Sequence, residues 1–267
     1  MDQTQEMDRE LRLLLTLTRR LPQVRGSGRI GHSIARFYRR RPRSPVVVDV
    51  LDFRMRLDPM EYVEGDLLFV PQIYDRGELA RLREMLRPGS VFLDVGANVG
   101  FYSLFASRLV GDSGLVLAIE ADPEVAQRLR ENLELNACRN VRVVPCGVSD
   151  REERLSLGVN LRGNRGSSSF LYSWQRSIEV PCLPLLAVLR EHGVTRVDAA
   201  KLDVEGFGVR VLRPYLAECT PDQLPHLVVI EKEDGVQDLL SPAGYVPIYE
   251  SAMNLTFHRD GADRART

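Results

Sequence analysis

The chain has 267 residues, of which 44% are hydrophobic and 27% charged, the proportions of an ordinary globular protein with one full core. Its formal net charge of −1 gives no argument for a nucleic-acid partner, and no apolar run approaches the roughly 18 residues of a transmembrane helix. The leucine-rich run near the start is short and interrupted by arginines, so we predict no signal peptide and expect a cytoplasmic protein.

Cysteine and lysine usage indicate the compartment and the source of the chain. The four cysteines are scattered without a CxxC pair, which is typical of a reduced cytosolic protein without a structural zinc site. Only two of the 36 basic residues, Lys201 and Lys232, are lysines. We interpret the excess of arginine as the codon bias of a GC-rich bacterial genome rather than as a requirement of function.

The first 75 residues are predicted to form a basic extension. Residues 1–44 contain eleven arginines and four acids, a local charge of +7 in a chain whose net charge is −1. Apolar residues at helical spacing predict amphipathic helices over 8–21 and 28–41, and the run 46–58 is typical of a β-hairpin. We expect the extension of residues 1–75 to be a lid over a cofactor cleft. A homodimer contact and a peripheral membrane contact through the basic helices are the alternatives.

Strands and helices alternate regularly from Ser90 onward. This order predicts a mainly parallel sheet with right-handed crossovers, in an α/β domain over residues 76–259. Residues 151–181 are predicted as an inserted β excursion, and residues 260–267 as a disordered tail. Ligands of such sheets bind at the carboxyl ends of the strands, near the point where the strand order reverses. The predicted strands are 91–95, 115–120, 141–146, 197–204 and 226–231, followed by a hairpin-like pair, and the predicted helices are 78–86, 98–110, 122–136, 184–192 and 208–217.

A turn of small residues, DVGANVG, follows the first of these strands. Gly96 and Gly100 allow a tight turn and the close approach of a ligand, and Asn98 is expected to cap the helix that follows. The pattern is not the GxGxxG of a dinucleotide site, and the carboxylate of Asp94 would repel a pyrophosphate. It suits a ligand that carries positive charge and no phosphate, such as S-adenosylmethionine. An NAD-dependent oxidoreductase is therefore disfavoured.

Two further strand ends complete the predicted cofactor site. Glu120 ends the second strand, where an acid accepts hydrogen bonds from two ribose hydroxyls. Gly147, in the run CGVSD after the third strand, is expected to line the adenine. Each of these residues alone is weak evidence for a cofactor site. The full set, in this order at the strand ends of an α/β sheet, is strong evidence. The expected cofactor-binding residues are Asp94, Gly96, Ala97, Asn98, Gly100, Glu120, Ala121, Gly147, Val148 and Asp203.

These motifs resemble those of the FkbM family of S-adenosylmethionine-dependent methyltransferases. The similarity runs from Tyr74 to Glu250, and its specific part is the pairing of DVGANVG with AKLDVEG. It implies a Rossmann-like class I methyltransferase fold with a seven-stranded sheet. It also implies O-methylation of a hydroxyl on a small molecule such as a sugar, a glycolipid or a secondary metabolite. Two positions depart from the family pattern: Gly208 stands where an acid is common, and Pro184 where an aspartate is usual.

Three carboxylates are the candidate catalytic groups. Methyl transfer is an in-line displacement, in which a placed base removes the proton of a neutral hydroxyl. Asp203 ends the fourth strand, Glu205 follows two residues later, and Glu231 ends the fifth strand. The alternative for Glu205 is a structural role as an acid at a helix N-terminus. The alternative for the group is to hold Mg²⁺, with Asp203 and Glu231 as candidate ligands.

A second function class also stays open. The departures at Gly208 and Pro184 favour a non-catalytic S-adenosylmethionine-binding module on the same fold, which would bind the cofactor without turnover. Nucleic-acid methylation is disfavoured because DVEG follows the fourth strand. DNA amino-methylating enzymes have an Asn/Asp-Pro-Pro-aromatic motif there. The predicted partner is therefore a small-molecule hydroxyl acceptor and not a nucleic acid.

Overall fold

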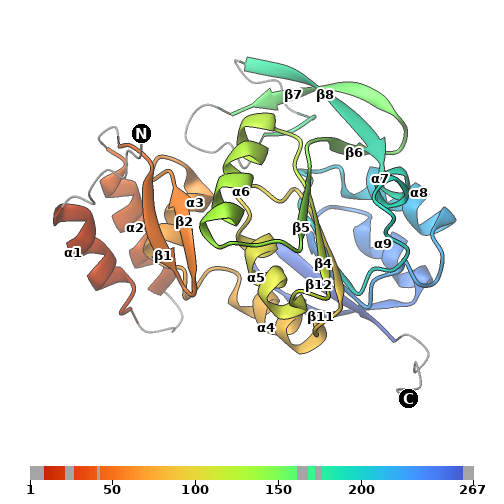
Figure 1. Cartoon of the computed structure of the whole chain (residues 1–267), viewed down its shortest axis with the longest axis horizontal. Coiled ribbons are helices and arrows are strands. Elements are labelled where there is room, and N and C mark those ends of the chain that lie inside the picture. The colour runs from red at the N-terminus through yellow and green to blue at the C-terminus, as the bar shows by residue number, and fades with distance from the viewer. Residues whose placement is uncertain (1–8, 22–26, 41–42, 161–167, 172–175, 261–267) are drawn as a thin grey trace.

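A seven-stranded sheet forms the centre of the molecule (Figure 1). In the order in which they lie side by side, its strands are β11 (Tyr245–Glu250), β12 (Asn254–Arg259), β10 (Leu227–Glu231), β9 (Ala199–Leu202), β3 (Val91–Val95), β4 (Leu115–Ile119) and β5 (Val141–Val144). The strands from β10 to β5 are parallel, whereas β12 is antiparallel to both β10 and β11. This confirms the predicted Rossmann-like class I sheet. The strand order reverses at β3, which has β4 on one side and β9 on the other.

The structure is a computed structural model and describes residues 9–21, 27–40, 43–160, 168–171 and 176–260. The predicted disordered tail lies outside these residues, apart from Asp260. No helix in the described part of the chain combines the length and the apolarity that crossing a membrane requires.

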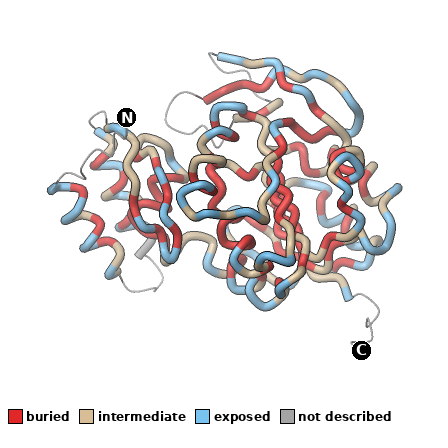
Figure 2. The backbone as a smooth tube through the Cα atoms, in the orientation of Figure 1, coloured by how far each residue is buried: buried red, intermediate tan, exposed pale blue. Residues whose placement is uncertain are grey.

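Helices cover both faces of the sheet, and each face has its own core. Because side chains alternate along a strand, Phe92 of β3 packs on one face, and Leu93 and Val95 pack on the other. The buried strands run through the middle of the molecule in Figure 2, with exposed residues on the outer sides of the helices. The helices of the Phe92 face are α4 (Arg76–Met85), α5 (Phe101–Val110) and α6 (Pro123–Leu135), and those of the other face are α7 (Leu185–Glu191), α8 (Gly208–Glu218) and α9 (Val236–Leu240), which the 3-10 turn η2 (Ser241–Ala243) follows.

A second sheet lies beyond the carboxyl end of β5. It consists of β6 (Gly147–Ser149), β8 (Arg176–Pro184) and β7 (Glu153–Val159), in that order, and forms the upper part of Figure 1. This confirms the predicted β excursion. Ser169 forms an isolated bridge with Gly158, which brings residues 168–171 beside β7.

The N-terminal extension is built from elements that the sequence mostly predicts. The helices α1 (Arg9–Thr18) and α2 (Ser27–Tyr38) and the hairpin of β1 (Val46–Val50) and β2 (Phe53–Leu57) match the expectation, whereas α3 (Tyr62–Phe69) was not predicted. Buried residues of the extension, such as Leu11 and Met55, belong to the same hydrophobic cluster as Phe92 of the central sheet. The expected boundary between residues 75 and 76 is therefore not a break in the core.

Asn132 of α6 and Asn136, the C-cap residue of that helix, also bond to the backbone of β2. The amide oxygen of Asn136 accepts a hydrogen bond from the N–H of Arg54 (2.9 Å), and its amide nitrogen donates to the carbonyl of the same residue (2.7 Å). Asn132 Oδ1 accepts in the same way from the N–H of Arg56 (2.7 Å). The outer edge of the hairpin is thus joined to a helix of the central domain.

Candidate active site

The turn after β3 lies between two neighbouring strands. The backbone N–H groups of Gly96 and Ala97 donate to the carbonyl of Ile119 at the end of β4 (2.9 and 3.0 Å). On the other side, the N–H of Asp203 donates to the carbonyl of Val95 (2.9 Å). Gly96 has φ +74°, and a Cβ built on it would lie 1.9 Å from the carbonyl oxygen of Asp203. Glycine is required here by both the conformation and the close approach.

The predicted cap of the following helix is wrong. The helix α5 begins at Phe101 with Gly100 as its N-cap residue, not at Asn98. Asn98 has φ +49°, and its N–H donates to Glu120 Oε2 (2.8 Å). The left-handed conformation keeps Asn98 in the turn, so the helix starts three residues later. A Cβ on Gly100 would lie 2.1 Å from Leu129 Cδ1, which indicates a packing role for this glycine.

Asp94 is fully buried and does not line the pocket described next. Its Oδ2 accepts a hydrogen bond from the hydroxyl of Ser103 (2.6 Å), while its Oδ1 has no hydrogen-bond partner among the described residues. Burial raises the pKa of Asp94, and the charge of Lys201, its register partner on β9, acts in the opposite direction. A buried carboxylate oxygen without a partner is rare and calls for an explanation by function.

A pocket of about 520 Å³ opens at the carboxyl ends of β3, β4 and β9. No lysine or arginine is among the described residues that line it, so it offers no cationic side chain to a phosphate. None of the described residues 9–21, 27–40 and 43–75 lines it. Of the expected cofactor residues, Gly96, Glu120, Ala121, Gly147, Val148 and Asp203 line the pocket, together with Glu205, whereas Asp94, Ala97, Asn98 and Gly100 do not.

Glu120 is held in place by two backbone N–H groups. Its Oε2 accepts from Asn98 and its Oε1 from Asp122 (2.9 Å). A carboxylate has about four acceptor positions, so one on each oxygen is left for a ligand. Burial raises the pKa of Glu120 to about 7, although the two backbone hydrogen bonds act in the opposite direction. The side chain is thus fixed in orientation and ready to accept from two hydroxyls.

The pocket wall near Gly147 contains an aromatic ring that sequence reasoning missed. A Cβ on Gly147 would lie 2.8 Å from Cζ of Phe170, and Phe170 packs against Phe207 with ring centroids 5.2 Å apart. The hydroxyl of Ser169 donates to the backbone carbonyl of Glu205 (3.0 Å), which ties this segment to the turn after β9. The run of serines before Phe170 is the one sequence signal near this ring. The position of Phe170 on the pocket wall depends on a contact between distant segments, which the sequence does not show.

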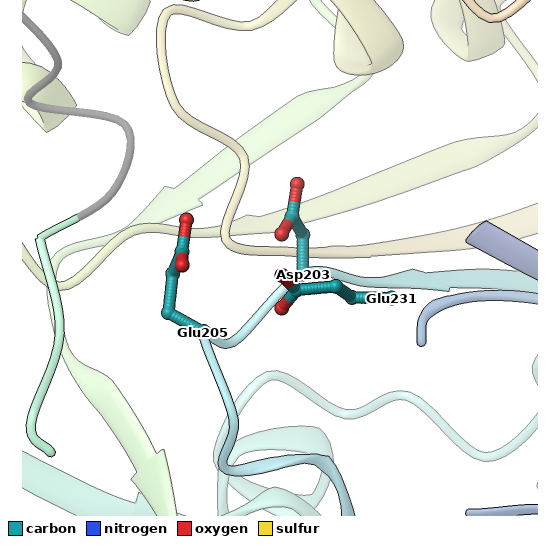
Figure 3. Close-up of side chains that lie close together, drawn as sticks. All are labelled: Asp203, Glu205 and Glu231. Carbon is teal, nitrogen blue, oxygen red and sulfur yellow. The ribbon is translucent and has the colours of Figure 1, made fainter. Parts of the chain in front are cut away.

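Three carboxylates converge after β9 and β10. Figure 3 shows Asp203 and Glu205 extending in the same direction, with Glu231 reaching across from the neighbouring strand. One oxygen of each lies within 4.8 Å of the others. Burial, and then the charges of Asp203 and Glu231, raise the pKa of Glu205 to about 8; burial and Asp203 also raise the pKa of Glu231. Sequence reasoning named all three residues, and the structure brings them together.

The turn that carries Glu205 is strained. Glu205 has φ +48° and the following Gly206 has φ +86°. A glutamate in the left-handed region is uncommon and costs about 1–3 kcal/mol, and such residues cluster at functional sites. This conformation and the backbone contact from Ser169 fix the carboxylate beside Asp203.

A buried lysine balances part of this negative charge. Lys201 Nζ lies 2.8 Å from Asp203 Oδ2 and 4.9 Å from the ring centroid of Tyr102. Burial alone would lower the pKa of Lys201, but Asp203, Asp94 and Asp75 outweigh it and raise that pKa. The hydroxyl of Tyr102 donates to Asp75 Oδ2 (2.9 Å). Lys201 therefore holds Asp203 in an ion pair.

The departure at Gly208 has a structural counterpart. The carboxylate of Glu233 accepts from the N–H groups of Gly208 (2.7 Å) and Val209 (3.3 Å). A Cβ at position 208 would come within 2.7 Å of Glu233 Oε2. The carboxylate of Glu233, from the loop after β10, thus lies against the first turn of α8. It fills the space that a side chain at position 208 would need. Pro184 ends β8 and precedes α7.

The chain is similar to known methyltransferases. The profile of the methyltransferase FkbM domain matches residues 94–241, more than half of the chain. A probable cobalt-precorrin-6B C(15)-methyltransferase (decarboxylating) of Sulfolobus acidocaldarius is 39% identical over 126 residues, which cover 47% of this chain and 61% of that protein. Methyltransferase sdnD of Sordaria araneosa is 29% identical over 178 residues, covering 55% of this chain and 65% of that protein. The chain spans less than two thirds of the length of both relatives.

Among solved structures, precorrin-6y C5,15-methyltransferase from Geobacter metallireducens superposes with a TM-score of 0.44 at 16% identity. The superposition covers 71% of this chain and 89% of that one.

Proposed function

This chain belongs to the methyltransferase FkbM domain family, and on that premise we propose that it methylates a hydroxyl of a small molecule with S-adenosylmethionine as donor. The acceptor class that we propose is a sugar, a glycolipid or a secondary metabolite. The observation that carries the proposal is the position of Glu120 and the carboxylates of Asp203 and Glu205 around one pocket at the switch point of the sheet. Four free cysteines at described positions accord with a reducing cytoplasmic location.

The lining of the pocket suits S-adenosylmethionine, whose sulfonium supplies a methyl group that an acceptor oxygen displaces. Glu120 has one free acceptor position on each oxygen for the two ribose hydroxyls. Phe170 and Val148, which line the pocket beside Gly147, offer an apolar wall for the adenine. The ammonium and sulfonium of the donor carry positive charge, which the carboxylate of Asp203 would stabilise.

We assign the role of general base to Glu205. A base works best when its pKa lies near the operating pH, and the pKa of Glu205 is about 8. Asp203 is less suited because it is ion-paired with Lys201. In the proposed step the acceptor hydroxyl gives its proton to a Glu205 oxygen, and the acceptor oxygen bonds to the methyl carbon as the bond from that carbon to sulfur breaks. The negative charges of Asp203 and Glu231 stabilise the positive charge of the donor.

Mg²⁺ is a second candidate ligand of the same carboxylates, because three oxygens within 4.8 Å match the oxygen ligands that it takes. The ion pair between Lys201 and Asp203 argues against it, since the ammonium already supplies a positive charge there. The non-catalytic alternative is weakened as well. Glu233 supplies a carboxylate beside Gly208, so one of the two departures from the family pattern is compensated.

Calorimetric titration with S-adenosylhomocysteine, with and without Mg²⁺, tests the cofactor assignment, and NAD serves as the negative control. We expect micromolar binding of S-adenosylhomocysteine, the same affinity with EDTA, and no binding of NAD. Transfer of a labelled methyl group to a panel of hydroxylated acceptors then tests catalysis. Glu205→Gln should retain binding and lose turnover. Absence of S-adenosylhomocysteine binding would overturn the proposal, and binding without transfer to any acceptor would favour the non-catalytic module.

A further inference from the structure

The pair of helices α1 and α2 presents an outer face that the pocket does not use. Four large apolar side chains on this face are more than half exposed: Leu13 (62%), Leu17 (56%), Ile30 (51%) and Phe37 (56%). Single exposed apolar residues are ordinary, whereas a group of them rimmed by polar residues marks an interaction surface. In Figure 1 these two helices lie at the end of the molecule farthest from α8 and α9.

On α1 the exposed leucines lie opposite the buried ones. Successive residues of a helix are rotated by about 100°, which places Leu13 and Leu17 on the side away from the core residues Leu11 and Leu15. The outer side of α1 therefore exposes two leucines among polar residues.

On α2 the apolar residues form a stripe. Ile30, Ile34 and Phe37 follow the spacing i, i+4, i+7 and so lie on one side of the helix. Together with Leu14 of α1 they line an open groove of about 680 Å³ between the two helices. The apolar stripe of α2 thus meets α1 at Leu14, next to the exposed Leu13.

Arginines surround this surface. One acid, Glu10, lies on the described residues of the two helices, and its carboxylate pairs with Arg43 at 2.7 Å. The guanidinium of Arg40 lies over the ring of Phe37, 5.4 Å from its centroid. The exposed arginines are Arg9, Arg12, Arg20, Arg29, Arg36 and Arg40.

We propose that the outer face of α1 and α2 docks on an anionic lipid bilayer. Exposed Leu, Ile and Phe side chains would enter the boundary between head groups and acyl chains, and the arginines would contact the anionic head groups. Helices of 10 and 12 residues are too short to cross a bilayer and suit a position in its plane. A second copy of this chain is a poorer occupant, because a two-fold interface would bring the same arginines of both copies together.

Polar contacts join α2 to the central domain through α3. His32 Nδ1 of α2 lies 2.8 Å from Asp66 Oδ1 of α3, and Glu64 of α3 pairs with Arg128 of α6, the helix that follows Glu120. Docking would hold the chain at the membrane surface. If the proposed methyl transfer holds, the favoured acceptor is therefore a hydroxyl on a lipid-linked molecule; the docking itself does not depend on the proposed function.

Co-sedimentation of the full chain with vesicles tests the docking without donor or acceptor. The probes are phosphatidylcholine vesicles with and without phosphatidylglycerol. We expect binding to the anionic vesicles at least about ten-fold tighter than to the neutral ones, and weaker binding at high salt, because each arginine near the surface adds attraction. The double variant Leu13→Ser/Phe37→Ser should lower binding to anionic vesicles by about ten-fold or more, because two inserted apolar side chains are lost.

Met253→Ser is the matched control, because Met253 is equally exposed (63%) and belongs to the turn between β11 and β12. It should bind as the unchanged protein does, and far-UV circular dichroism of all variants should be the same. Equal binding to neutral and anionic vesicles, or equal losses in the control and the double variant, would overturn the proposal. So would a dimer in light scattering that Phe37→Ser dissociates, since the face would then be covered by a second copy.

Discussion

Gly96 and Asp203 are in contact through the backbone, and a side chain at position 96 would meet the carbonyl oxygen of Asp203 at 1.9 Å. The two residues follow neighbouring parallel strands, β3 and β9, where the strand order reverses. One close approach therefore joins the turn of the proposed cofactor site to the turn that carries the candidate catalytic acids. The two turns can lie this close together because Gly96 has no side chain.

We expect Gly96→Ala to destabilise the fold and to remove S-adenosylhomocysteine binding. Any alanine at positive φ costs about 1–2 kcal/mol, and here the added methyl also meets a backbone oxygen that cannot move alone. Thermal unfolding and calorimetric titration measure the two effects. Gly193→Ala is the matched control, since Gly193 has φ +67° and nothing lies within 4 Å of its Cβ position. Equal effects in both variants would show that the contact with Asp203 is unimportant.

Glu120→Gln should weaken S-adenosylhomocysteine binding by about ten- to hundred-fold, because hydrogen bonds to a charged group contribute about 1.5–3 kcal/mol. The amide group also turns a donor toward the N–H of Asn98 or of Asp122. Titration calorimetry gives the dissociation constants. Glu124→Gln changes an exposed acid on the following helix, paired with Arg176 at 3.1 Å, and should leave the affinity unchanged. An unaltered dissociation constant for Glu120→Gln would remove the ribose assignment.

Glu205→Gln should make the protein more stable at high pH. The pKa of Glu205 is raised from 4.5 to about 8 in the folded protein. The protonated form is therefore favoured by folding, and this contribution is complete below pH 4.5 and is lost as the pH rises through about 8. A neutral glutamine avoids the loss. The melting temperature of the variant should exceed that of the unchanged protein by a few degrees above pH 8 and match it below pH 4.5. A difference of the same size at both ends would mean that charge is not its cause.

Arg128→Ala should destabilise the protein by about 3–5 kcal/mol near pH 8, because it leaves a buried carboxylate without its partner. Glu64 is 2% exposed, and burial raises its pKa to about 7 even with Arg128 present. The loss should shrink as the pH falls below 7, where Glu64 takes up a proton and no buried charge remains. Thermal unfolding at several pH values measures this. Arg130→Ala, on the same helix and without an ion pair in the described structure, should change little; a pH-independent loss in Arg128→Ala would contradict the explanation.

Periodicity and strand ends predicted the central sheet and the converging carboxylates. Buried strands alternating with amphipathic helices leave few arrangements, and the carboxyl ends of parallel strands must lie at one edge. Asp203, Glu205 and Glu231 could therefore be placed together from their positions after two strands. The same reasoning failed at Asn98, because a residue that favours caps also tolerates the left-handed conformation of a turn.

Features that depend on partners from distant parts of the chain were not predicted. The helix α3 contains Glu64 and Asp66, whose charges suggest an exposed segment, yet their partners Arg128 and His32 allow them to be buried or nearly so. The environment of Lys201 likewise depends on Tyr102. The position of Phe170 depends on the bridge between its neighbour Ser169 and Gly158 of β7. Spacing along one chain carries no signal for such contacts.

Asn132 of α6 and its C-cap residue Asn136 affect how the parts of the chain assemble. Four residues of a helix advance about 6 Å and two residues of a strand about 6.8 Å, so side-chain amides at 132 and 136 match the peptide groups at 54 and 56. The helix therefore acts as a surrogate neighbouring strand for the open edge of the hairpin. If residues 1–75 were produced without the central domain, the peptide groups at this edge of the hairpin would lose their partners. Such an open edge tends to pair with other chains. We therefore expect the hairpin and the central domain to unfold together, because each supplies hydrogen-bond partners to the other.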